Sequence, residues 1–400
     1  MYKFLTILSF YIIAATLYGY AQERYTISTS DSITYQYYMN GDWENVIRSG
    51  NESIQQQVDF KWLRQRMGYA YYMKGDYYKA LQQYEKALAF DTSDTVTLTY
   101  LYYCGLFSNN EAFARYQAGK LPADIQKKLK VKLLRIVDAL DVEYNYKINT
   151  LTTRSNPGYY RIGINSQLGY RVNLYQAFSN YTQRIDSAAI NQNEYFALAD
   201  WSVNAHMSLS LGYHYLGTNI ADTIRYRVNR RMISTRIDST FYPGNLFYSR
   251  LSIRLNRLDL SLSGSVLDYD NTLTQQYGIQ AGYALPGKLK VYVRSSLFGL
   301  LSPVNKRLIF SQSIGAYFFN SLWAEGNITL GNLKNYAENN GLYVYNSDDA
   351  TTFRTGLSLY WNVTRNVILF GNYSYNRKQT GTTAINYNQH SISTGIIWKI

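Results

Sequence analysis

The sequence predicts a chain in two parts: a short helical repeat region, then an antiparallel transmembrane β-barrel of about 14 strands. Three observations lead to this fold class. Apolar residues recur with a helical period in the first part and with a period of two from Val142 to the C-terminus. The second part alternates one apolar face with one polar face, as strands between lipid and water do. No internal run of about 18 apolar residues is present to form a membrane-spanning helix.

The composition of the 400 residues also favours a barrel. The chain holds 43 Tyr and 26 Gly but only 5 Pro, and 17% of its residues are charged. Lipid offers no partner to unpaired backbone groups, so a membrane protein without apolar helices has to close its sheet. The net charge of +13 is spread along strands and loops, whereas nucleic-acid binding is indicated by basic clusters with interleaved aromatics. We therefore expect no nucleic acid as a partner.

Residues 1–21 have the features of a signal peptide. Lys3 precedes an apolar stretch from Phe4 to Tyr18, and Gly19 and Ala21 place small residues where a signal peptidase reads them. We expect cleavage after Ala21 and export of the mature chain. An uncleaved membrane anchor is the alternative, which the short apolar stretch disfavours.

Residues 22–141 are predicted to form helical repeats and a connecting helix. The segment Tyr38 to Trp43 returns at residues 72–77, an offset of 34 residues, and a degraded third copy begins near Leu98. The repeated small and aromatic residues are Gly41, Trp43, Gly68, Tyr71, Gly75, Tyr77, Ala80, Tyr84 and Ala87. Small residues let two antiparallel helices approach, and aromatic rings fill the groove between them. In length and residue types the second copy resembles a tetratricopeptide repeat.

The repeats have two possible roles. Their groove is either a docking site for a periplasmic protein or peptide, or the repeats are a spacer with no ligand. The lone Cys104 has no partner for an internal disulfide, so we expect it to be packed inside a repeat.

A basic amphipathic helix is predicted between the repeats and the barrel. Pro122 and Asp124 open it, and its apolar residues run from Ile125 to Leu140. Its other face carries Lys127, Lys128, Lys130, Lys132 and Arg135. Such a helix either rests on the membrane surface or caps the repeats.

Residues 142–400 are predicted to form the barrel. The expected strand starts lie near residues 142, 158, 171, 192, 206, 246, 258, 274, 288, 307, 322, 351, 366 and 387. Connections alternate between tight turns and longer links, the latter at 184–191, 218–245, 299–306, 334–350 and 378–386. Short turns belong on the periplasmic side of bacterial barrels, which places the repeats and the C-terminus in the periplasm.

A soluble β-sandwich is the alternative to the barrel. It would turn its apolar faces inward and show more charge outside. Here Tyr and Trp recur near strand ends, which is typical of aromatic girdles at membrane interfaces. These residues are Trp201, Tyr213, Tyr215, Trp361, Tyr373, Tyr375 and Trp398.

The last eight residues, 393–400, carry a pattern of their own. Gly395, Trp398 and Ile400 occupy the glycine, aromatic and terminal apolar positions. The pattern resembles the signal by which barrel assembly machinery recognises outer-membrane barrels, with Ile400 where Phe is usual. The resemblance implies an outer-membrane location, with membrane lipid and that machinery as partners. Residues from about 159 to 400, including 170–175 and 210–217, also resemble YaiO-type outer-membrane barrels, a family that implies no particular activity.

Strand parity predicts which charged side chains line the lumen. The lumen candidates are Lys147, Arg161, Arg171, Arg250, Arg254, Lys288, Lys290, Arg294, Arg307, Glu325 and Arg354. The further inward carboxylates are Glu143, Glu194, Asp200 and Asp259. An excess of positive charge in a narrow aqueous space concentrates anions, which predicts a preference for an anionic solute or acidic saccharide. Mutual neutralisation of these charges as structural ion pairs is the alternative.

We find no basis for an enzyme, a cofactor or a metal site. His206 and His214 share a strand but lie eight residues apart, roughly 27 Å along it, so they cannot act on one atom. His390 has lipid-facing parity. No metal-ligand spacing and no catalytic residue can be assigned.

The order of repeats and barrel resembles that of exopolysaccharide export ports. It implies a barrel that conducts a solute or polymer while the repeats dock a periplasmic partner. The alternative is a non-conducting anchor that presents the repeats to the periplasm and binding loops to the exterior.

Overall fold

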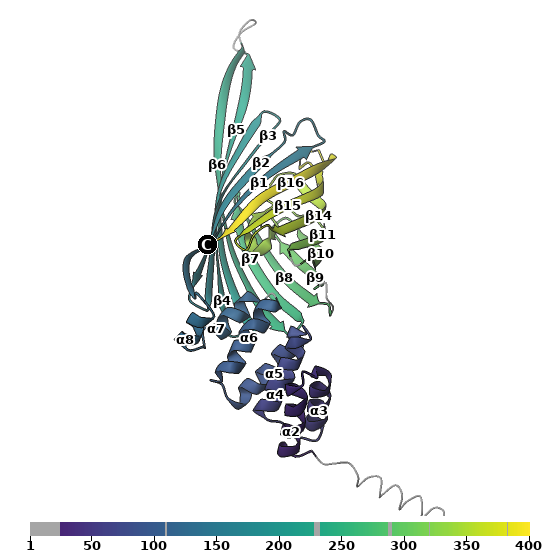
Figure 1. Ribbon diagram of the computed structural model, residues 1–400. Helices are drawn as coiled ribbons and strands as arrows, with labels where there is room; N and C mark the ends of the chain where they lie inside the picture. Colours follow the sequence, from purple (N-terminus) through teal and green to yellow (C-terminus); the bar gives the residue numbers. More distant parts are fainter. Residues whose placement is uncertain (1–24, 109, 228–232, 287–289, 320, 382) are drawn as a thin grey trace, which may run out of the picture. The chain divides into compact units, whose positions relative to one another are not determined.

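Figure 1 shows the computed structural model of the chain, which describes residues 25–108, 110–227, 233–286, 290–319, 321–381 and 383–400. The predicted signal peptide lies outside the described residues. The chain divides into two compact units, the first ending at Lys127 and the second beginning at Lys128. In the described part of the chain, no helix is long and apolar enough to cross a membrane.

The first unit consists of helices. Those described are α2 (Ile27–Met39), α3 (Trp43–Gln55), α4 (Lys61–Met73), α5 (Tyr77–Phe90), α6 (Thr95–Phe107), α7 (Glu111–Ala118) and α8 (Ala123–Lys128). The starts of α2, α4 and α6 are 34 residues apart, and so are the starts of α3, α5 and α7. The unit is therefore a row of three helical hairpins with the predicted interval.

The turn inside each hairpin has a local cause. Gly41 and Gly75 adopt φ of 69° and 76°, a left-handed conformation that glycine adopts without steric cost. Asp42, Asp76 and Asn110 then cap α3, α5 and α7 by accepting a hydrogen bond from the backbone three residues on. The same device thus opens the second helix of all three hairpins.

Small residues allow the helices of the middle hairpin to approach closely. A Cβ atom added to Gly68 would lie 2.9 Å from the Tyr84 ring. Ala80 and Ala87 are fully buried, and Tyr84 is 1% exposed. Tyr71, by contrast, is partly exposed beneath Lys79, whose Nζ lies 5.4 Å from the ring centroid.

The second unit is a closed antiparallel barrel of fourteen strands, as the sequence predicts. Its strands are β1 (Leu134–Asn149), β2 (Gly158–Leu168), β3 (Val172–Ile185), β4 (Ala188–Ser202), β5 (Met207–Arg227), β6 (Ile233–Leu255), β7 (Leu258–Tyr269), β8 (Thr272–Ala284), β9 (Tyr292–Leu301), β10 (Lys306–Phe318), β11 (Leu322–Leu330), β14 (Ala350–Asn362), β15 (Val367–Gln379) and β16 (Asn386–Lys399). Each strand pairs with its neighbours in sequence, with β11 beside β14, and β1 closes the barrel against β16.

Two rims follow from this order. We call the rim where β1 begins and β16 ends the terminal rim, and the opposite one the loop rim. Apart from residues 285–291 between β8 and β9, which are only partly described, the connections at the terminal rim are two to four residues long. At the loop rim, β5 and β6 extend beyond the other strands as one long hairpin (Figure 1).

The outer surface of the barrel is apolar. In β1, Val142 and Tyr144 are half exposed, whereas Glu143 and Asn145 on the other face are 5% and 7% exposed. This places apolar side chains outside and polar side chains inside, the arrangement of a membrane barrel and the opposite of a soluble sandwich. Trp201, Trp361 and Trp398 face outward near the terminal rim, where an interfacial girdle belongs.

The predicted basic helix up to Leu140 is wrong. Helix α8 ends at Lys128, Lys130 adopts a positive φ of 55°, and β1 already begins at Leu134. The reason is tertiary: Leu134 pairs with Leu168 of β2 and Ala139 with Lys399 of β16. Pairing with both neighbours outweighs the local helical pattern.

Several connections also differ from the predictions. The link expected at 184–191 is a two-residue turn, because β3 continues to Ile185 and β4 begins at Ala188. The link expected at 218–245 is largely strand, with β5 and β6 paired as far as Arg227 and Ile233. β9 begins at Tyr292, four residues after the expected start.

Burial of Cys104 gives a test of the helical unit. The side chain is fully buried, and this burial raises the pKa of the thiol to about 12. We expect no maleimide labelling of the folded protein at pH 8, because labelling requires an accessible thiolate, and complete labelling in denaturant. Cys104→Ala combined with Ser93→Cys is the matched control, since Ser93 is exposed and its replacement should label at once. Fast labelling of the native Cys104 would contradict this packing.

Candidate functional site

The barrel interior is closed by the connection between β11 and β14. We call residues 331–349 the plug segment; it contains β12 (Ala337–Glu338), a 3-10 turn at Asn339–Gly341, and β13 (Tyr343–Val344). Leu333 is 1% exposed and Ala337 is 4% exposed, although neither belongs to the barrel wall. A barrel of fourteen strands is too wide for its own side chains to fill, so a further segment is needed to occupy it.

Three apolar clusters join the plug segment to the wall. Leu342 packs in one cluster with Ala177, Phe196, Leu198 and Tyr248. The second cluster combines Ala337 with Leu216, Leu246 and Leu267, and the third combines Leu333 and Tyr336 with Leu300 and Ile309. These inward Leu, Ile and Phe residues interrupt the polar lining of the wall where the plug segment covers them.

Backbone groups of the plug segment find polar partners on the wall. Gln276 donates to the carbonyl of Ala337 and accepts from its N–H, both at 2.9 Å, as a neighbouring strand would. His214 Nδ1 lies 2.7 Å from the carbonyl oxygen of Gly341, so this ring nitrogen carries the proton. Buried backbone groups require such partners, and here the wall side chains supply them.

A buried ion cluster lies on β1 and β2 against the plug segment. Arg161 is 3.1 Å from Asp141 and 3.0 Å from Glu143. The Tyr343 hydroxyl donates to Glu143 at 2.7 Å, and Arg161 donates to the same hydroxyl at 3.2 Å. One plug residue thereby adds two hydrogen bonds to a wall ion pair.

Two further ion pairs hold the plug segment, one near its middle and one at its C-terminal end. Arg354 of β14 pairs with Glu338 at 2.5 Å and also contacts the Tyr345 hydroxyl. Asp349 accepts from Arg154 at 2.8 Å and from the Tyr387 hydroxyl at 2.7 Å. With the apolar clusters, these contacts reach β1 to β10, β14 and β16. At this level the plug segment crosses the lumen.

Most of the predicted lumen residues face inward. Strand register places eight of them on the inner face: Lys147, Arg161, Arg250, Arg254, Arg294, Arg307, Glu325 and Arg354. Arg171 instead lies in the turn between β2 and β3, with its guanidinium 5.3 Å from the Tyr170 ring centroid. Lys290 lies before β9 with a positive φ of 45°, and Lys288 lies outside the described residues. A strand that starts at residue 288 would place both lysines in the wall, but β9 begins at Tyr292.

The structure pairs some of the inward charges and not others. Arg254 lies 2.8 Å from Asp259, and Arg161 and Arg354 are paired as described above. Among the described residues, no carboxylate lies within 4.0 Å of Lys147, Arg250, Arg294 or Arg307. The same holds for Lys378, an inward lysine of β15 that the sequence analysis missed. The sequence does indicate the inward orientation of Lys378, because this residue alternates in phase with the polar Asn376 and Ser374 along the strand.

An inward aromatic patch lines the wall at the terminal rim. It comprises Tyr292, Tyr317, Trp323, Tyr360 and Phe370, on the adjacent strands β9, β10, β11, β14 and β15. Trp323 lies 4.5 Å from Tyr360 and 6.3 Å from both Tyr292 and Tyr317, measured between ring centroids. Sequence reasoning assigned aromatics near strand ends to the membrane interface and therefore overlooked those with inward parity.

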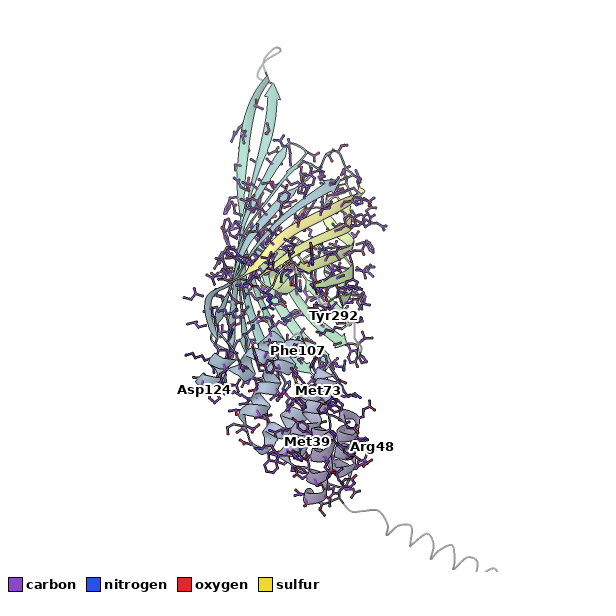
Figure 2. All side chains as sticks on the ribbon, viewed as in Figure 1. Met39, Arg48, Met73, Phe107, Asp124 and Tyr292 are labelled. Carbon is purple, nitrogen blue, oxygen red and sulfur yellow. The ribbon has the colours of Figure 1, made fainter. Side chains whose placement is uncertain are left out.

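Polar groups accompany the aromatic patch. The Tyr292 hydroxyl donates to Glu325, and the guanidinium of Arg294 lies 5.4 Å from the Tyr292 ring centroid. Arg294 faces inward yet is exposed, so water reaches the wall at this level. Figure 2 labels Tyr292 at the first residue of β9.

The three histidines have separate environments. His214 lies 3.4 Å from Glu194 and contacts the plug segment, as described above. His206 precedes β5 and is not part of the strand, so the predicted shared strand is wrong for it. His390 faces outward, as expected, and is hydrogen-bonded to the Tyr373 hydroxyl at 2.8 Å.

The C-terminal pattern lies on β16. Gly395 is opposite Phe370, whose ring would lie 2.3 Å from an added Cβ atom, so a larger residue does not fit there. Trp398 and Ile400 are both 54% exposed. The role of these residues in recognition by assembly machinery stays a prediction.

Comparisons with known proteins find solved structures that are similar to this chain, but no similar sequence. No family model matches the chain, and no curated protein sequence matches it. A bacterial polysaccharide outer membrane secretin is similar over 66% of this chain and 99% of its own, with 9% identity and a TM-score of 0.38. The KdgM porin is similar over 65% and 99%, with 7% identity and a TM-score of 0.33. The toluene transporter TodX of Pseudomonas putida is similar over 66% and 91%, with 5% identity and a TM-score of 0.45.

The ion pair between Arg354 and Glu338 gives a test of the closed lumen. Arg354→Met leaves Glu338 without its counter-charge inside the barrel and should weaken docking of the plug segment by about 1–3 kcal/mol. We expect faster amide hydrogen exchange across residues 337–344, measured by mass spectrometry. The double variant Arg354→Met with Glu338→Gln removes the unpaired charge and should recover part of the protection. Unchanged exchange in the single variant would show that this pair does not hold the segment.

Proposed function

We propose that the protein is a gated outer-membrane port for a saccharide or another solute with anionic groups. The observation that carries this proposal is a wide membrane barrel whose lumen is closed by one segment that is not part of its wall. Leu330 of β11 pairs directly with Phe353 of β14, so the wall is continuous without residues 331–349. Departure of the plug segment would therefore open the lumen without breaking a strand pair of the barrel.

The inward aromatic patch supports a saccharide as the solute. Sugar rings combine apolar C–H faces with hydroxyl groups, and aromatic rings beside a few polar groups suit both features. Trp323 and Tyr360 offer the rings, and Glu325 and Arg294 offer hydrogen-bonding groups beside them. Export of a polymer, as in the exopolysaccharide ports that the domain order resembles, is one form of this function.

Orientation and partners belong to the same proposal. The signal peptide and the C-terminal pattern support export and insertion into the outer membrane, with the terminal rim toward the periplasm. The tetratricopeptide-like hairpins would then be periplasmic and dock a partner protein. Met39, Met73 and Phe107, labelled in Figure 2, end α2, α4 and α6, and they are 63%, 49% and 40% exposed. Such a repeated row of exposed apolar residues suits a protein partner.

A non-conducting anchor for the helical hairpins is the second candidate. The buried ion pair between Arg154 and Asp349 favours it, because breaking such a pair is costly. The two candidates differ in whether the plug segment ever leaves the lumen.

Replacing the plug segment tests the port. We expect a variant with residues 334–347 replaced by a short Gly/Ser linker to show steady single-channel currents in planar bilayers, because the wall stays closed while the lumen empties. The mean conductance should exceed that of the native chain by about tenfold or more. As control, an equal linker replaces residues 380–385 between β15 and β16, which should leave the native closed state. A folded but silent variant would favour the anchor.

The apolar row tests docking by the helical hairpins. A photo-crosslinking residue at Met73 should capture a discrete periplasmic partner in cells, because the row is exposed and repeats through all three hairpins. The same residue at Glu85 of α5, outside this row, is the control. Equal capture at both positions, or none at Met73, would remove the row as a docking surface.

A further inference from the structure

Two lysines lie inside the barrel without a matching carboxylate. Lys378 of β15 is only 7% exposed, and Lys147 of β1 is partly buried on the same inner face. Lys147 makes a cation–π contact with Tyr181, in which its Nζ lies 5.4 Å from the ring centroid. Among the described residues, no hydrogen-bond acceptor and no ion-pair partner is found for the Lys378 ammonium. Lysine is almost never buried without a partner, because removing its charge from water is costly.

The sheet register brings the two lysines around one polar patch. Lys147 is opposite Ser391 of β16, which is opposite Ser374 of β15. Lys378 is opposite Tyr387, and the positions between the two lysines hold Gln389 and Asn376. Ser374, Asn376, Gln389 and Ser391 are all 2–6% exposed and face the lumen. The patch thus offers neutral hydrogen-bonding groups flanked by two cations.

Among the described residues, no carboxylate lies within ion-pair distance of either lysine of the patch. Lys147 is repelled by Lys378 and by Arg354, whose register position is opposite Asn376. It is attracted by Glu143 and Glu194, but these carboxylates lie beyond ion-pair distance and already contact Arg161 and His214. Asp349 attracts Lys378 but lies beyond ion-pair distance and is already held by Arg154 and Tyr387. Lys147 thus faces two other cations in a poorly hydrated interior, so a bound anion would stabilise this arrangement.

We propose that Lys147 and Lys378 form a binding site for an oxyanion on the lumen wall. The ligand is a carboxylate, sulfate or phosphate group, held by the two ammonium groups and by the amides of Asn376 and Gln389. Three or more donors converging from β1, β15 and β16 match the several acceptor oxygens of such a group. The site lies on the wall beside the plug segment, away from the aromatic patch at the terminal rim.

The class of solute follows from this site only if the proposed port function holds. On that basis the transported solute carries an acidic group, as an acidic saccharide does. Binding itself does not require conduction, so the site can be tested on the closed protein. Failure to bind and failure to conduct are then separate results.

Calorimetry on the detergent-solubilised full chain tests the site. The probes are sodium sulfate, sodium phosphate and sodium galacturonate at constant ionic strength, with galactose as the neutral counterpart of galacturonate. We expect at least one oxyanion to bind and galactose not to bind there. Lys378→Met and Lys147→Met should each weaken this binding by about tenfold or more, because each removes a charge-assisted hydrogen bond. Lys378→Arg should retain most of it.

The matched control is Lys306→Gln, which removes an exposed lysine at the start of β10 and should bind like the native chain. Heat-modifiable migration in gels and thermal unfolding show whether each variant is folded. A folded Lys378→Met protein should gain no thermal stability from the oxyanion, whereas the native chain should. Binding of galacturonate assigns the site to a sugar acid, and binding of sulfate or phosphate alone assigns it to those groups. Equal binding by the native chain and both methionine variants, or no binding of any oxyanion by the native chain, overturns the proposal.

Discussion

The constraint on which this structure depends is the filling of a wide, closed barrel. Fourteen strands satisfy their backbone groups by pairing all around, and this closure fixes an interior larger than the wall side chains can fill. The plug segment supplies the missing contacts. It carries apolar residues into three separate clusters and brings backbone groups within reach of His214 and Gln276. The buried Leu, Ile and Phe residues of these three clusters on the inner face of the wall are explained by this one segment.

The inward charges fall into two groups with different consequences. Arg161, Arg254 and Arg354 lie within 4.0 Å of carboxylates, so much of the predicted positive field is neutralised in place. This result favours the structural interpretation of those residues. Lys147, Lys378, Arg250, Arg294 and Arg307 have no such partner among the described residues. Lys378 is attracted by Asp349 at the end of the plug segment. The unpaired positive charge therefore lies on several strands of the wall, and its two lysines lie on β1 and β15.

The sequence predicts the fold better than it predicts the site. Alternation along each strand is a local signal, so the number of strands and the inward parity of Arg161 or Arg354 could be read directly. The helix predicted up to Leu140 failed because its residues pair with strands far away in sequence. The plug segment escaped prediction for the same reason: Tyr343 meets Glu143 across 200 positions, and no periodic pattern encodes that contact.

Closure by a segment outside the wall makes the energetics of opening separable from those of the barrel. In the proposed port, strand pairing of the wall would be the same with the plug segment in or out, so only the segment's own contacts would decide between the two states. A ligand shifts that balance only by the difference between its affinities for the closed and open forms. An oxyanion bound beside Lys378 would have different affinities for the closed and open forms, because Lys378 also attracts Asp349. Asp349 is the residue at which the plug segment rejoins the wall. Neutralising Lys378 removes that attraction and leaves Arg154 and Tyr387 to hold Asp349, which favours release of this end of the segment.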